Sequence, residues 1–344
     1  MVMKGRRLRV AIVGAFSILS LSILLLGWRS DEFVGRLLWL SGANDLPTDQ
    51  HILEPPTIAW SQVRWSGDIQ DPGLNESSGL AASNYQQNLL WSINDSGDGP
   101  NVFAMSTKGE ALGRWQVDTA SPTDWEAMDS FVLEGEKYLL IADVGDNFAG
   151  RETVSFVVVK EPQLNSKQTK PLPVEWRVEF SYPDGPRDCE AVAVDADRQR
   201  VLLVSKRTFP NELYSVPLRD GIGEQVIAQK LANLYPLPRN VPEHEKLYGE
   251  AAPFQGMPTG MSLRGNKLLV TTYRDAYLYD VRDVAKEPAR IPLPLAGQRE
   301  GIAFVGNFET IAYVSRERKN GTEVADLFRI DFAIAVPEQK LQGE

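Results

Sequence analysis

Three glutamates of this 344-residue chain occupy equivalent places in a repeated pattern. Glu126, Glu190 and Glu300 each stand directly before an Ala or a Gly and then an aliphatic residue. Carboxylates that converge on one point repel each other unless a cation neutralises them. Hard oxygen ligands of this kind suit calcium or magnesium. The pattern therefore predicts a divalent metal site that includes these glutamates, with calcium as the expected ion.

Other polar residues flank the same short apolar runs. Those expected to bind a small polar ligand are Asp95, Asp124, Asp146, Asn147, Asp188 and Arg316. Lys206 and Arg274 are the catalytic candidates, because cations stabilise the charge that develops when a metal-activated water attacks an ester, lactone or phosphoester. Two alternatives stay open. The carboxylates could pair internally with Lys206, Arg207, Arg274 and Arg316, or the Asp and Asn residues could only cap turns.

These residues are carried by a repeat of short apolar strands separated by Gly, Pro, Asn and Asp, which is a strand-and-turn pattern. Five units open with a motif of a small residue and an aliphatic: Ser78–Leu80, Glu126–Met128, Glu190–Val192, Thr259–Met261 and Glu300–Ile302. The spacing is close to the repeat of about 40–50 residues that is typical of propeller blades. We therefore expect an all-β, five-bladed β-propeller. A sixth blade could be hidden only in the two longer gaps, and a two-sheet β-sandwich is the alternative fold.

Each unit continues with a second and a third strand, and four units show a fourth, which in the third unit is expected at Glu224–Lys230. The fifth unit lacks a fourth strand, whereas a spare strand precedes the first unit at Ile58–Trp65. We expect this N-terminal strand to complete the last blade and close the ring. In an antiparallel blade, the start of the first strand and the end of the second lie at the same face. The polar residues named above therefore converge on one mouth of the channel.

Composition excludes several classes of function. The chain has 46 Asp and Glu against 36 Lys and Arg, a formal net charge of -10, which argues against nucleic acid as a partner. A single cysteine, Cys189, and two histidines exclude an intrachain disulfide framework, a cysteine-rich zinc site and a histidine-rich metal centre. The sequence motifs of α/β-hydrolases, zincins, P-loop enzymes and Rossmann folds are absent.

The N-terminal segment predicts a membrane anchor. Four cations precede residues Val10–Trp28, a run of 19 residues without a charge. A helix of that length spans the hydrocarbon core, and the positive-inside rule places its N-terminus in the cytoplasm. The expected domains are a cytoplasmic stub and signal anchor (1–30), a linker (31–57), a periplasmic propeller (58–335) and a polar tail (336–344). We thus expect a single-pass protein of the inner membrane; a cleaved signal peptide is the alternative.

Roughly residues 58–332 resemble uncharacterised bacterial β-propeller proteins, which are distantly similar to esterase-like phytase and gluconolactonase-type propellers. The resemblance is carried by the strings Glu76–Leu80, Asn94–Asp98, Asp124–Ala127, Asp143–Asn147 and Asp188–Ala191. In those enzymes, acidic residues around the channel mouth hold a divalent metal. The resemblance implies the same here, with Glu126, Asp143, Glu190 and Glu300 at the nearest positions. The chain lacks the richness in basic residues expected of a phytase.

Two functions from different classes follow. The first is a metal-dependent hydrolase of an ester, lactone or phosphoester. The second is a non-catalytic propeller that binds a small polar ligand or an envelope protein through the same mouth. Propellers perform both roles, so the fold does not choose between them.

Overall fold

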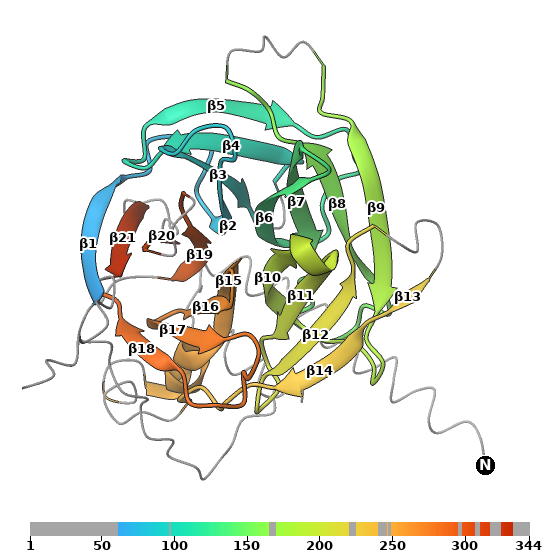
Figure 1. The fold of residues 1–344 in the computed structure, drawn as a ribbon, viewed down its shortest axis with the longest axis vertical. Coiled ribbons are helices and arrows are strands. Elements are labelled where there is room, and N and C mark those ends of the chain that lie inside the picture. Colours follow the sequence, from blue (N-terminus) through green and yellow to red (C-terminus); the bar gives the residue numbers. More distant parts are fainter. Residues whose placement is uncertain are drawn as a thin grey trace, which may run out of the picture.

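The computed structural model describes residues 61–95, 98–164, 170–219, 225–239, 246, 249–294, 298–306, 310–316 and 325–332. These residues form twenty-one strands in five sheets, and two 3₁₀ helices, η1 (Ala196–Arg198) and η2 (Gly249–Gly256). Viewed down its short axis, the protein is a ring of sheets with one strand of each near the centre (Figure 1). The all-β, five-bladed propeller predicted from the repeat is therefore confirmed for the described residues.

The blades follow each other around the ring in chain order. Blade 1 contains β2 (Ser77–Ala82), β3 (Leu89–Asn94), β4 (Asn101–Ser106) and β5 (Ala111–Gln116). Blade 2 contains β6 (Trp125–Leu133), β7 (Glu136–Asp143), β8 (Val154–Lys160) and β9 (Val174–Ser181), and blade 3 contains β10 (Cys189–Asp195), β11 (Arg200–Ser205), β12 (Glu212–Pro217) and β14 (Gln229–Asn233). Blade 4 contains β15 (Pro258–Arg264), β16 (Lys267–Thr272), β17 (Asp275–Asp280) and β18 (Ala289–Pro292). Blade 5 contains β19 (Arg299–Phe304), β20 (Ile311–Arg316) and β21 (Asp326–Phe332).

The fourth strand of blade 5 comes from the start of the domain. Strand β1 (Ser61–Asp68) pairs antiparallel with β21, from Ser61 opposite Phe332 to Asp68 opposite Asp326. The ring is therefore closed by strands from both ends of the domain, which leaves β21 without an open edge. This confirms the expected closure, although the strand is displaced toward the C-terminus relative to the expected Ile58–Trp65, of which Ile58, Ala59 and Trp60 lie outside the described residues.

The predicted fourth strand of blade 3 is divided between two blades. Val226 and Ile227 form β13, which pairs in parallel with the outer strand β9 of blade 2. The chain then turns at the buried Ala228 and continues as β14, which pairs with β12. The single strand expected at Glu224–Lys230 is thus wrong in detail. Its first half covers the hydrogen-bonding edge of blade 2, which would otherwise be open.

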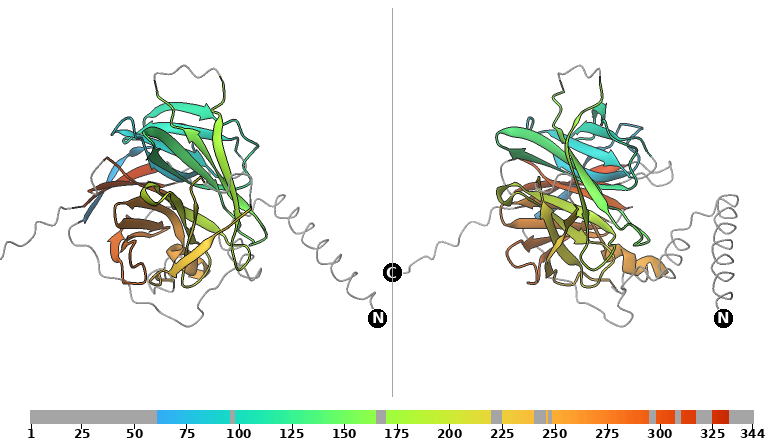
Figure 2. Two further views of the ribbon diagram at one scale, coloured as in Figure 1. Left: turned by 45° about the vertical axis from the view of Figure 1, so that its right-hand side comes forward. Right: turned by 90° about the vertical axis from the view of Figure 1, so that its right-hand side faces the viewer.

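The apolar core lies between the blades. Among the described residues, buried side chains form five clusters, one at each junction of neighbouring blades. In the cluster between blades 1 and 2, for example, Trp91 and Trp115 of blade 1 pack edge-on with 5.2 Å between ring centroids, and Trp125 and Met128 of blade 2 belong to the same cluster. The side views show the blades inclined to each other around the ring (Figure 2). This packing holds the five inner strands β2, β6, β10, β15 and β19 around a narrow axis.

The anchor predicted at Val10–Trp28 lies outside the described residues. In the part of the chain that the structure describes, no helix combines the length and the apolar character that a membrane crossing requires. The anchor stays a prediction.

Candidate functional site

All five inner strands carry an irregularity at the same end. Their pairing with the second strand slips between Ser77 and Gly79 and at the equivalent places of the other blades. The residues at these β-bulges are Ser78 in blade 1, Glu126 in blade 2, Glu190 in blade 3, Thr259 in blade 4 and Glu300 with Gly301 in blade 5. A bulge redirects a side chain out of the regular alternation of a strand. The position at which the three glutamates recur in the sequence is therefore the bulge position.

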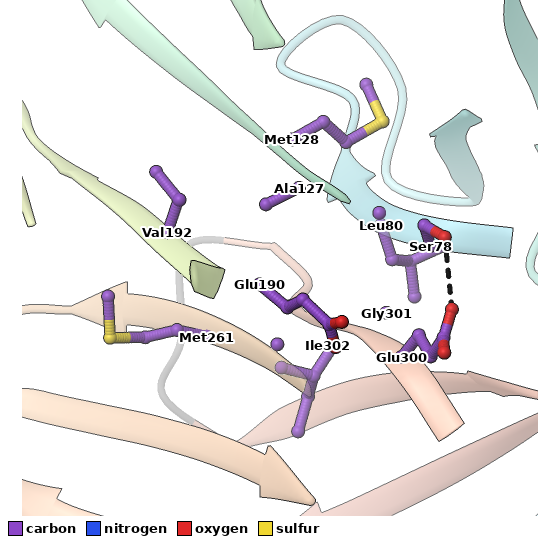
Figure 3. Close-up of a pocket in the computed structure, with 12 residues that line it drawn as sticks. Ser78, Leu80, Ala127, Met128, Glu190, Val192, Met261, Glu300, Gly301 and Ile302 are labelled. Carbon is purple, nitrogen blue, oxygen red and sulfur yellow. Dashed lines mark hydrogen bonds between the residues drawn. The ribbon is translucent and has the colours of Figure 1, made fainter. Parts of the chain in front are cut away.

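The side chains of three of these bulge residues line a cavity on the axis. Ser78, Glu190 and Glu300 surround it together with aliphatic side chains such as Leu80 and Ile302 (Figure 3). Its volume is about 10 Å³, close to the room that a single water needs. The cavity that the described residues form on the axis therefore has room for about one water molecule.

At the mouth, three carboxylates of blades 1 and 2 meet. One oxygen from each of Asp95, Asp124 and Glu126 lies within 4.8 Å of the other two. Asp95 follows β3, and the other two flank the start of β6, so the bulge at Glu126 brings them together. We call these three residues the acidic trio. Such a set of oxygens could hold a metal ion.

Two carboxylates of the trio, Asp124 and Glu126, have raised pKa values, mainly because they are buried. Burial raises the pKa of Asp124 to about 7, and the charge and hydrogen bond of Asp95 add to the effect. Burial also raises the pKa of Glu126 well above its usual value, with the charge of Glu190 as the next cause. Among the described residues, neither Asp124 nor Glu126 forms an ion pair with a Lys or an Arg. A divalent cation would relieve this repulsion in place of the protons.

Glu190 and Lys206 form a buried ion pair within blade 3. The Lys206 ammonium also donates to the Tyr273 hydroxyl at 2.9 Å. Burial raises the pKa of Glu190 to about 7 even though Lys206 opposes the shift. Burial disfavours the Lys206 ammonium, but the attraction of Glu190 keeps its pKa raised. The second oxygen of Glu190 is buried and has no hydrogen-bond partner in the described structure, so this carboxylate keeps one acceptor for a ligand.

Two other predicted ligand-binding residues, Asp188 and Asn147, are bound by an arginine of the protein itself. Arg207 donates its Nε to Asp188 and its Nη2 to Asn147, and the Asp146 amide donates to Asp188 at 3.0 Å. The internal pairing that the sequence left open as an alternative is therefore present in blade 3. The excess negative charge stays on the side of blades 1 and 2.

The loop after β7 is held by its own carboxylates. Asp143 accepts from Arg151 at 2.7 Å and from the amides of Thr123 and Asp124. Asp146 accepts from the amides of Gly150 and Arg151 at 2.8 Å. Asp143 thus supports the backbone that leads to the acidic trio and is not one of its three members. This loop also contains Phe148, which is 69% exposed.

The remaining candidates lie on the side of blades 4 and 5. Arg316 forms a bidentate pair with Asp326 of the neighbouring strand, at 2.8 and 3.2 Å. Arg274 is buried two residues after the end of β16, and its amide donates to Thr272 Oγ1 at 3.2 Å. Glu300 accepts from Ser78 Oγ at 3.0 Å (Figure 3). The structure therefore brings Glu126 together with Asp95 and Asp124, and it gives Arg316 and Glu300 other partners.

Two residues of the mouth were not expected from the sequence. Tyr273 contacts Lys206 through its hydroxyl, and Ser78 lies beside Glu300. Both had a usable signal, because Tyr273 directly follows the second strand of its unit and Ser78 occupies the position of the three glutamates. They were missed because neither residue is charged.

Comparisons with known proteins yield only distant likenesses. No protein-family model matches the chain, and no curated protein matches it. Among solved structures, a gluconolactonase from Xanthomonas campestris is 10% identical with a TM-score of 0.43, covering 84% of this chain and 99% of that one. The PQQ-bound aldose sugar dehydrogenase from Streptomyces coelicolor is 12% identical with a TM-score of 0.40, covering 80% and 100%. A luciferin-regenerating enzyme is 10% identical with a TM-score of 0.42, covering 79% and 95%.

The solved structures that resemble this chain thus include a gluconolactonase and a sugar dehydrogenase at 10–12% identity, in agreement with the distant resemblance that the sequence indicated. The TM-scores are too low to carry an argument about the site, which is therefore interpreted from its own residues.

Proposed function

We propose that this protein binds a divalent cation, calcium by preference, through Asp95, Asp124 and Glu126 at the mouth of its propeller. The observation that carries the proposal is the convergence of three carboxylate oxygens within 4.8 Å. The raised pKa values of Asp124 and Glu126 support it, because burial and, after it, the charges of neighbouring carboxylates disfavour their ionised forms, which a cation would stabilise. The unpartnered oxygen of Glu190 is a further acceptor in the same mouth.

The donor set fits calcium better than a transition metal. All the donors are oxygens, and carboxylates suit hard cations. Calcium accepts six to eight oxygens in flexible geometry, so a ligand and waters can complete the shell of three protein carboxylates. The two histidines and the one cysteine of the chain leave no nitrogen and sulfur set for zinc or copper.

We further propose that the cation and the mouth together act on a small polar ester, lactone or phosphoester. A bound cation would polarise the scissile group and lower the pKa of a coordinated water. Lys206 is engaged by Glu190 and Tyr273, so we assign it to holding Glu190 in place. Arg274 keeps its proposed role of stabilising the negative charge that develops on the substrate.

The alternative function is binding without catalysis. The axial cavity of about 10 Å³ favours it, because no deep pocket for a substrate is formed by the described residues at the axis. In that case the cation-loaded mouth would bind a small polar ligand or an envelope protein. In both cases we propose that Val10–Trp28 anchors the protein in the inner membrane, with the propeller in the periplasm.

The two functions are separated by one experiment. The purified full-length chain is dialysed against a chelator and assayed on a panel of esters, lactones and phosphoesters, with and without added calcium. Hydrolysis that needs calcium and is lost in Asp124→Asn supports the enzyme. Calcium binding without hydrolysis of any member supports the binding protein.

The matched control is Glu136→Gln. Glu136 lies in an exposed ion pair with Lys160, at the opposite end of the β6–β7 hairpin from Glu126, and its change should leave the calcium response intact. Equal activity of the wild type with chelator and with calcium would contradict the metal-dependent function.

A further inference from the structure

Arg299 is a buried cation with an incomplete set of hydrogen bonds. It is the first residue of β19, at the mouth end of blade 5, and its exposed fraction is 0%. Its Nη1 donates to the Tyr273 carbonyl of blade 4 at 3.0 Å. Its guanidinium carbon lies 5.5 Å from the centroid of the Phe328 ring. Its Nε and Nη2 are buried and have no acceptor within the described structure.

These two atoms belong to one edge of the guanidinium plane. Nε–H and Nη2–H point in the same direction and form the fork that a carboxylate or a phosphate accepts with two oxygens. Arg316, which pairs in register with Arg299 on β20, uses this same edge on both oxygens of Asp326. Arg207 uses it on Asp188 and Asn147. Arg299 therefore presents the edge that its neighbours use for oxyanions.

The carboxylates closest to Arg299 are engaged elsewhere. Asp326 is paired with Arg316, and Asp275 is paired with Arg290 at 3.1 Å. Glu300, the next residue in the chain, accepts from Ser78. Arg274 adds a second positive charge nearby, and burial and this charge together lower the pKa of Arg299 to about 10. A buried guanidinium edge without an acceptor is costly, so this arrangement favours an anion.

A second buried arginine, Arg239, does not present such an edge to an oxyanion. Arg239 also has two nitrogens without an acceptor, but these are Nε and Nη1. They do not share an edge, so one oxyanion cannot bridge them. Its Nη2 donates to the Lys206 carbonyl at 3.0 Å and to Asn211 at 3.2 Å, which is a structural role.

We propose that the Nε and Nη2 edge of Arg299, with Arg274 beside it, is an oxyanion-binding subsite between blades 4 and 5. The ligand of the mouth then carries a compact phosphate or carboxylate group. This deepens the proposed function and rests on it for the claim that the ligand binds at the mouth. The mouth would bind a cation on the side of blades 1 and 2 and a negative group on the side of blades 4 and 5.

The test measures the melting temperature of the full-length chain with inorganic phosphate or acetate, in a chelator and at constant ionic strength with chloride as reference. At a hundredfold excess over the dissociation constant, the bound anion should raise the melting temperature by roughly 5 °C. Arg299→Gln should abolish the rise. Arg282→Gln, which changes an exposed arginine of blade 4, should keep it. A larger rise with phosphate assigns a phosphorylated ligand, and a larger rise with acetate a carboxylated one.

Arg274→Gln covers the case in which Arg299→Gln does not fold, and it should weaken the anion response. Asp124→Asn should keep the anion response while losing the calcium response. The proposed anion subsite and the proposed metal site can therefore be refuted independently of each other. No rise in the wild type, or an equal rise in the wild type and in either mouth arginine variant, would overturn the subsite.

Discussion

Lys206 and Glu190 form a buried ion pair at the point where the acidic side of the mouth ends. Glu190 occupies the bulge of β10, and Lys206 directly follows β11, so the pair joins the first two strands of one blade. On one side of it lie the acidic trio and on the other the arginines of blades 4 and 5. The pair thus separates two regions of opposite charge around one axis.

The first prediction concerns this pair. Lys206→Met leaves the Glu190 carboxylate buried without its cation, which should cost about 3–5 kcal/mol of unfolding free energy. The double variant Glu190→Gln with Lys206→Met should be more stable than Lys206→Met alone, because it removes the unpaired charge as well. Urea denaturation measures both.

The control for the pair is Lys160→Met, which breaks the exposed pair with Glu136 and should cost less than about 1 kcal/mol. A Lys206→Met variant as stable as this control would show that the buried pair contributes no stability.

The second prediction tests the position of the loop after β7. A Cβ at Gly145 would overlap the Asp124 carboxylate and come within 2.7 Å of Glu126 Cγ. Gly145→Ala should therefore displace two members of the acidic trio, weaken calcium binding at least tenfold and lower stability by about 1–3 kcal/mol. Calorimetry and urea denaturation measure the two effects.

Gly150→Ala is the matched change in the same loop, because nothing lies within 4 Å of the added Cβ. It should leave calcium binding unchanged. If the two alanine variants bind calcium equally well, Gly145 does not support the site.

Part of this site could be predicted from the repeat in the sequence. Glu126, Glu190 and Glu300 were recognised because a repeat aligns them, and the bulges give the physical reason. The repeat also predicted the ring and its closure, since strand periodicity and turn residues are local signals. The fourth strand of blade 3 is divided into β13 and β14. This division was not predictable, because it depends on the open edge of β9 in another blade.

The ion-pair and hydrogen-bond partners of the mouth residues also could not be predicted from the sequence. Asp188 and Asp124 stand at equivalent positions before their inner strands, yet one is paired with Arg207 and the other joins the trio. The difference arises because Arg207 stands two residues after Ser205, the register partner of Cys189, whereas Gly145 occupies the equivalent place in blade 2. Such pairings depend on rotamers and on loops, which no single-sequence pattern encodes.

The third prediction concerns pH. Burial raises the pKa of Asp129 to about 6. The hydrogen bonds from the amides of Val194 and Ser130 and the charge of Arg264 act in the opposite direction and lower it, but burial is the larger effect. Because the folded state holds this proton more tightly, its contribution to stability is complete below about pH 4 and is lost as the pH rises through 6. The stability of the wild type relative to Asp129→Asn should therefore fall, by on the order of 2 kcal/mol, between pH 4 and pH 7.

Urea denaturation of both proteins at several pH values gives this difference directly. The Asn side chain keeps an acceptor for the Val194 amide, which donates to Asp129 at 2.7 Å. If the difference in unfolding free energy between the two proteins is constant, or rises with pH, the pKa of Asp129 is not raised in the folded state.

The fourth prediction concerns closure of the ring. Deletion of Ser61–Asp68 removes β1 and exposes the edge of β21. The melting temperature should drop by about 10 °C or more, since the loss of several kcal/mol produces a shift of that size in a domain of this length. Arg64→Ala, a change of an exposed residue on the same strand, should shift it by only a degree or two. A deletion variant that melts with the wild type would contradict closure by β1.

The measurement that tests the central claim most directly is a calorimetric calcium titration of the chelator-treated full-length chain. The acidic trio predicts one calcium site in the wild type and in Glu136→Gln, and its loss in Asp124→Asn and in Glu126→Gln. Absence of calcium binding in the wild type, or unchanged binding in both trio variants, would contradict a metal site built from Asp95, Asp124 and Glu126.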